Sequence, residues 1–101
     1  GIAVPDASDL YFEQGYLYVI ARMQNKILKI HPGTAVCENE LDFSALAARL
    51  YVSEKGYGFA EGMAMHKGKI FLLFDSNGRT IRNSKIGEHG TLAIIQRPEH
   101  F

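Results

Sequence analysis

Cysteine is nearly absent from this sequence, since Cys37 is the only one in 101 residues. A lone cysteine cannot form a disulfide within the chain, and it excludes zinc sites built from several cysteines. We expect Cys37 to be a small apolar residue in a strand. The hydrophobic residues, 47% of the sequence, are enough to bury a core in one small domain.

An excess of charge of either sign is also missing, because 11 Lys and Arg balance 11 Asp and Glu. Binding to a phosphate backbone needs a cluster of surplus cations. The one local basic cluster, Arg79, Arg82 and Lys85, is interrupted by neutral residues and followed by Glu88. No apolar run approaches the roughly 18 residues of a membrane-spanning helix. We therefore expect neither a nucleic-acid partner nor a membrane span.

The motifs of common catalytic sites are missing as well. None of the 4 histidines is spaced i, i+4 from another, and the sequence contains neither HExxH nor GxSxG. The glycines of Gly56-Tyr57-Gly58 are not followed by the GK[ST] of a phosphate loop. No motif identifies a reaction, so the sequence leaves open whether the protein is an enzyme.

An internal similarity is present. A shift of 53 positions aligns residues 7–28 with residues 60–81 without a gap. Identity is low, but the pattern of side-chain size and polarity is kept, and both segments contain a glycine at the same place, Gly15 and Gly68. Fixed-period self-similarity of this kind is typical of repeat architectures. The sequence predicts two copies of one unit, residues 1–54 and 55–101.

Each copy follows the same order of strands and turns. An alternating strand comes first, and a polar turn that ends in glycine follows it, because glycine adopts the positive φ of tight hairpins. A short apolar run then predicts a strand buried on both faces, and a second polar turn leads to a third strand. The predicted segments in the two copies are 10–12 and 63–65, 13–15 and 66–68, 16–21 and 70–74, 22–25 and 75–78, and 26–31 and 79–82.

After the third strand the copies diverge. In the first copy, residues 34–38 predict an outer strand, and residues 42–50 have helical composition with Asp42 or Ser44 as the N-cap. In the second copy, residues 91–96 predict an outer strand.

These features predict an all-β fold of two four-stranded antiparallel β-propeller blades. A unit with two apolar faces needs a neighbour on each side, and two blades cannot close a ring. The chain is then part of a larger propeller of about six blades, or copies of it assemble. A small two-sheet β-sandwich is the alternative. We expect the following aromatic residues in the core between blades, with an exposed aromatic platform as the alternative: Tyr11, Tyr16, Tyr18, Phe71 and Phe74.

The two units resemble blades of the SdiA-regulated and phytase-like-esterase group of β-propellers. The similarity lies in Ser8-Asp9-Leu10 followed by residues 15–20, in Ala60-Glu61-Gly62-Met63-Ala64 followed by residues 68–75, and in the connection Leu41-Asp42-Phe43-Ser44. It covers about 70 residues of the chain, and other propeller families share much of the pattern. The resemblance implies five or six blades in a whole protein, and it favours an extracellular or periplasmic location.

Polar residues at the start of the innermost strand face the mouth of a propeller's central channel, which here selects Ser8, Asp9 and Glu61. Oxygen ligands from several blades could hold Ca²⁺ there, as the resemblance to lactonase-type propellers suggests. The alternative is structural, with Glu61 accepting backbone N–H groups from a neighbouring blade. Asp75 could add a calcium ligand, or it could cap its own turn.

Two functional hypotheses follow from these observations. In the first, the chain is a propeller segment that acts by ligand binding and assembly, and its partners are further blades from other copies or from a longer chain. In the second, it is a metal-assisted hydrolase of the esterase, lactonase or phytase-like kind, with Glu61 and Asp9 at the channel mouth. The second rests on resemblance, since a fold does not determine a function.

Overall fold

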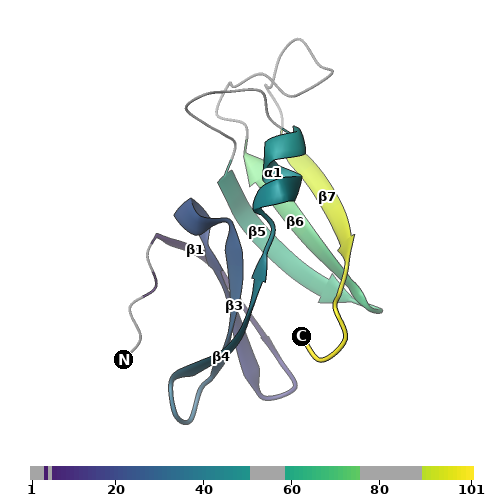
Figure 1. Ribbon diagram of the computed structural model, residues 1–101. Helices are drawn as coiled ribbons and strands as arrows, with labels where there is room; N and C mark the ends of the chain where they lie inside the picture. Colours follow the sequence, from purple (N-terminus) through teal and green to yellow (C-terminus); the bar gives the residue numbers. More distant parts are fainter. Residues whose placement is uncertain (1–3, 5, 51–58, 76–89) are drawn as a thin grey trace.

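The structure, a computed structural model, describes residues 4, 6–50, 59–75 and 90–101. Strands dominate these residues and form two antiparallel sheets, one of four strands and one of three (Figure 1). These two sheets confirm the predicted all-β class, while the number of propeller blades stays a prediction. No helix in the described ranges is long and apolar enough to cross a membrane.

The first sheet has its strands in sequence order: β1 (Ala7–Glu13), β2 (Tyr16–Ala21), β3 (Lys26–His31) and β4 (Val36–Asp42). The hairpin between β1 and β2 turns at Gln14 and Gly15, whose φ angles of 50° and 84° are both positive. Two positive φ angles in a two-residue turn match the right-handed twist of the flanking strands. A 3₁₀ turn, Arg22–Gln24, joins β2 to β3.

A short helix, α1 (Ser44–Leu50), follows β4 and leads toward the second sheet. Its first backbone N–H, that of Ser44, donates to Oδ1 of Asp42 at 2.8 Å. The hydrogen bonds from Ser44 lower the pKa of the Asp42 carboxyl below its ordinary value. The predicted helix is therefore present. Its N-cap position is Phe43, and Asp42, one residue earlier, accepts the first N–H, while β4 extends beyond the predicted end at residue 38.

The second sheet has the order β5 (Phe59–His66), β6 (Lys69–Asp75) and β7 (Thr91–Gln96). The strand bonded to β6 is β7, so the third place in this sheet belongs to residues 91–96. The sequence pattern predicts the third strand at residues 79–82, which lie outside the described residues. The pairing corrects this assignment: the predicted outer strand is the direct neighbour of the buried one.

The first hairpins of the two sheets have the same register. Leu10 pairs with Val19 and Phe12 with Leu17, and the positions offset by 53 pair in the same way. Each hairpin has one extra residue on its first strand, between Ala7 and Leu10 in β1 and between Ala60 and Gly62 in β5. Such a β-bulge bends the strand and leaves a residue unpaired.

Each sheet has two faces. We call face A the face that carries Tyr11 and Tyr18 in the first sheet and the positions offset by 53, Ala64 and Phe71, in the second, and we call the other face of each sheet face B. Directly opposed residues of an antiparallel pair share a face, so the registers assign the side chains of the paired residues. In the first sheet, face A carries Tyr11, Tyr18, Ile20 and Ile27, and face B carries Leu10, Phe12, Leu17, Val19 and Leu28. In the second sheet, face A carries Ala64, Phe71, Leu73, Leu92 and Ile94, and face B carries Met63, Met65, Ile70, Leu72 and Ala93.

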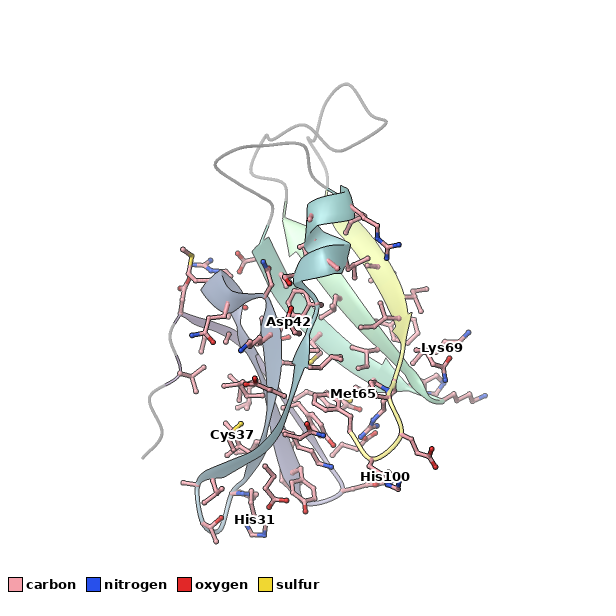
Figure 2. All side chains as sticks on the ribbon, viewed as in Figure 1. His31, Cys37, Asp42, Met65, Lys69 and His100 are labelled. Atoms are coloured by element: carbon pink, nitrogen blue, oxygen red, sulfur yellow. The ribbon has the colours of Figure 1, made fainter. Side chains whose placement is uncertain are left out.

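The core lies between face A of the first sheet and face B of the second. The sheets approach most closely at β1 and β5. Figure 2 shows Met65 between the two sheets and Lys69 on the outer side of the second sheet. Away from β1 and β5, Phe43 packs on Phe74 with ring centroids 6.0 Å apart, and Phe101 packs on Tyr18 at 5.5 Å.

The two apolar strands differ in burial. The end of β2 is buried on both faces, as predicted, since Val19, Ile20 and Ala21 are all in the core. In β6, only face B is buried, and Leu73 is 48% exposed. The prediction of two buried faces is therefore wrong for β6 in this chain. Of the five predicted core aromatics, Tyr18 and Phe74 are fully buried and the others are partly exposed.

The adjacent residues Leu72 and Leu73 give a matched test of this packing. Leu72→Ala removes a fully buried side chain and should lower the free energy of unfolding by about 2–5 kcal/mol. Leu73→Ala, on the exposed face, should cost less than about 1 kcal/mol. Urea unfolding at low protein concentration measures both values. Equal losses for the two variants would contradict the assignment of faces.

Candidate functional site

Most of the polar residues selected from the sequence meet along the line where β1 faces β5. We call this line the seam, and it includes the following residues: Asp6, Ser8, Asp9, Tyr11 and Arg22 from the first sheet side, and Ala60, Glu61, Met63 and Met65 from β5. The candidates Ser8, Asp9 and Glu61 therefore lie along the same contact between the two sheets. Figure 1 shows the two strands side by side.

Two side chains of β1 bind the backbone of β5 directly. The Ser8 hydroxyl donates to the carbonyl of Ala60 at 2.7 Å. Oδ2 of Asp9 accepts the N–H of Met63 at 2.8 Å, and its Oδ1 accepts the N–H of Leu10 at 2.8 Å. One carboxylate thus satisfies two backbone donors, one in each sheet. The N–H of Met63 is partly buried, and leaving it without a partner would destabilise the fold, so this contact contributes to the packing of the sheets.

The bulges bring these groups together. In β5 the extra residue lies between Ala60 and Gly62, beside the carbonyl that Ser8 binds and the N–H that Asp9 binds. The bulge in β1 lies at Ser8 and Asp9. Bulges interrupt the ladder and redirect side chains, which here lets two short side chains reach across to the other sheet.

Arg22, in the turn after β2, forms the charged end of the seam. Its guanidinium makes two 2.8 Å hydrogen bonds to the Asp6 carboxylate, and Nη1 makes a third to Oε1 of Glu61 at 2.8 Å. The hydrogen bonds to Asp6 and then to Glu61 raise the pKa of Arg22 above its ordinary value. Glu61 is therefore in an ion pair with the other sheet.

The contacts bear on the two interpretations of Glu61. A Ca²⁺ ion would need several carboxylate or carbonyl oxygens directed at one point. Within the described part of the chain, no group of three or more His, Cys, Asp and Glu side chains could hold a metal ion. Asp75 ends β6, and its side chain lies outside the described residues. Calcium binding and metal-assisted hydrolysis stay predictions from the resemblance. The observed partner of Glu61 is the guanidinium of Arg22, whereas the structural alternative expected backbone N–H groups of a neighbouring blade.

A second polar cluster at the hairpin end of the sheets escaped the sequence analysis. Arg97, after β7, forms an ion pair with Glu13 and donates to the Tyr18 hydroxyl at 2.8 Å. It also donates to the main-chain oxygen of Phe101 at 2.9 Å, and the Tyr18 hydroxyl donates to the same oxygen at 3.0 Å. Burial is the largest single effect and lowers the pKa of Arg97, but the hydrogen bonds and charges of Glu13 and Tyr18 together outweigh it, so this pKa is raised.

No sequence signal pointed to this cluster, because Arg97 follows a strand with no counterpart in the aligned segments. The sequence does contain a signal for Arg22, because this arginine stands where the second copy has Asp75. Opposite charges at equivalent positions indicate that the two copies use this position differently.

No family model matches the chain, and no curated protein or solved structure shows a significant match to it.

Asp9 gives the most direct test of the seam. Asp9→Ala leaves the N–H groups of Met63 and Leu10 without their acceptor and should lower the free energy of unfolding by about 1–3 kcal/mol. Asp9→Asn keeps one carbonyl oxygen and should recover part of the loss. Urea unfolding gives the stabilities, and amide exchange at Met63 reports the bond itself. Unchanged exchange in the alanine variant would contradict the assigned acceptor.

Glu61 separates the ion pair from the metal site. If Glu61 forms an ion pair with Arg22, Glu61→Gln should lower the midpoint of thermal unfolding. Calcium should then change the midpoint of neither the wild type nor the variant. Moderate salt should also lower the wild-type midpoint more than that of the variant, because salt screens this ion pair, whose side chains are 32% exposed. Differential scanning fluorimetry with CaCl₂ and with NaCl at equal ionic strength measures both effects. A calcium-dependent rise in the wild type that Glu61→Gln abolishes would support the metal site instead.

Proposed function

We propose that this chain is a two-blade segment of a β-propeller, made of two copies of one unit, and that it acts by binding further β-sheets through the exposed apolar residues of its two outer faces. The observation that carries the proposal is the order of the faces. Face A of the first sheet packs on face B of the second, so the two sheets follow each other head to tail. Such packing uses different surfaces on its two sides and can continue from sheet to sheet.

A closed sandwich would leave a different surface. Its two sheets turn their apolar faces toward each other, and their outer faces are polar. Here the outer face of the second sheet carries three large apolar side chains that are about half exposed, Leu73, Leu92 and Ile94. An apolar surface of this kind marks an interaction site in a protein. The outer side therefore fits a sheet that awaits a neighbour.

The shared register supports the proposal that the two hairpins are copies. Both have a two-residue turn with positive φ at both positions, Gln14-Gly15 and Lys67-Gly68. Both have a bulge at the same place, and this bulge lies on the strand that forms the seam. In a propeller the inner strands of neighbouring blades approach most closely, as β1 and β5 do here. A complete ring of about six blades would need two more pairs of sheets.

The proposal is tested by placing a charge on the outer face. Ile94 is 55% exposed on β7, so Ile94→Lys should leave the urea midpoint nearly unchanged. It should reduce binding of an apolar dye at low protein concentration and reduce association with other sheets at high concentration. Thr34→Lys, in an exposed turn of the first sheet, adds the same charge and should change neither property. Equal dye binding by the wild type and the Ile94 variant would exclude an open interaction face.

A further inference from the structure

The open face of the second sheet contains a hollow. It has a volume of about 300 Å³ and lies over two small residues of β5, Gly62 and Ala64. Its other lining residues are Asp9, Met63, Phe71, Leu73 and Leu92. A side chain at residue 62 would point into this space, because a Cβ built there meets Leu73 at 3.4 Å and 3.7 Å.

The hollow exists because the two sheets differ at equivalent positions. In the first sheet the positions of Gly62 and Ala64 hold Asp9 and Tyr11. Those two side chains reach the second sheet at the seam, where Tyr11 donates to the carbonyl of Met65 at 3.0 Å. The second sheet presents the same face without these side chains. A partner that packs on this face must therefore fill the hollow with a large side chain of its own.

The opposite end of the chain carries such bulk. Phe12 and Leu10 of β1 lie on face B of the first sheet and are 63% and 59% exposed. Their equivalents in β5 are Met65 and Met63, the face B residues at the internal seam. The rest of this face is better covered, since Val4 packs against the cluster of Val19 and its neighbours. The exposed apolar residues Leu10 and Phe12 thus lie on β1, the strand equivalent to β5, which forms the internal seam.

We propose that the occupant is a second copy of this chain, docked head to tail, with its Phe12 in the hollow over Ala64. This inference rests on the proposed function, because it assigns a partner to the same open face. Across the internal seam a large Tyr11 meets Met65, whereas across the new seam a small Ala64 meets the large Phe12. Small residues on one strand let the backbones approach and the ring enter the hollow.

Electrostatics permits the association. The formal net charge of the chain is zero, so two copies do not repel each other through a common charge. The two docking surfaces are apolar and lie on different sheets, which makes the interface heterologous. A chain with one hollow and one Phe12 can therefore receive one copy and bind another.

Two variants, each damaged on one side, test this arrangement. Phe12→Asp removes the ring and keeps the hollow, while Ala64→Phe fills the hollow and keeps Phe12. Each should weaken self-association at least about tenfold, because burying a phenylalanine contributes more than the free energy of one tenfold step. Both positions are exposed, and the first sheet already has an aromatic residue, Tyr11, at the place of Ala64. Far-ultraviolet circular dichroism and urea unfolding confirm that the variants are folded, and Ala64→Leu replaces Ala64→Phe if that variant is not.

Sedimentation velocity on the complete chain gives the outcome. The wild type should form oligomers at micromolar concentrations, and each variant alone should be a monomer. An equimolar mixture should form a dimer and grow no further, because only one intact hollow and one intact Phe12 remain in each pair.

Three outcomes contradict the inference: a monomeric wild type, variants that still assemble, or a mixture that stays monomeric. A monomeric wild type whose dye binding is still removed by Ile94→Lys would leave the open face in place and assign it to another partner, such as further blades of a longer chain. Failure of the dye experiment would remove the proposed function itself.

Discussion

The hydrogen bond from the backbone of Met63 to the carboxylate of Asp9 joins the two sheets at the point where both are irregular. A bulge interrupts the ladder in each hairpin, and the groups that it displaces need partners. Asp9 and Ser8 supply these partners across the seam, and Arg22 adds an ion pair to Glu61 at the same end. The relative position of the sheets depends on this line of contacts, and the apolar core fills the space beside it.

Three of the polar residues that suggested chemistry, Ser8, Asp9 and Glu61, take part in the contacts between the two sheets. A carboxylate just before an apolar strand needs either a cation or hydrogen-bond donors. Glu61 has the guanidinium of Arg22, and Asp9 has two backbone N–H groups. The Arg97 cluster has the same function at the other end of the sheets, where it ties the chain after β7 to Tyr18 and Glu13. Polar groups therefore fix both ends of an apolar contact.

Local chemistry explains which elements could be predicted. The strands at residues 16–21, 26–31 and 91–96 and the helix after Asp42 follow from apolar runs, turn glycines and a cap, all of which act within a few residues. The neighbour of β6 could not be predicted, because residues 79–82 and 91–96 both carry a strand pattern and only packing decides between them. The role of Arg97 was equally hidden, since its partners are far away in the sequence.

By itself, the sequence determined the all-β class, the two hairpins with their glycine turns, and the positions of Ser8, Asp9 and Glu61 in the first strand of each sheet. These features depend on side-chain periodicity and backbone φ, which are local properties. Only the tertiary structure decided that face A of one sheet meets face B of the other, that Leu73 is left exposed, and that Asp9 binds Met63. Those outcomes depend on how the two sheets approach each other, and this approach is controlled by contacts between residues that are distant in the sequence.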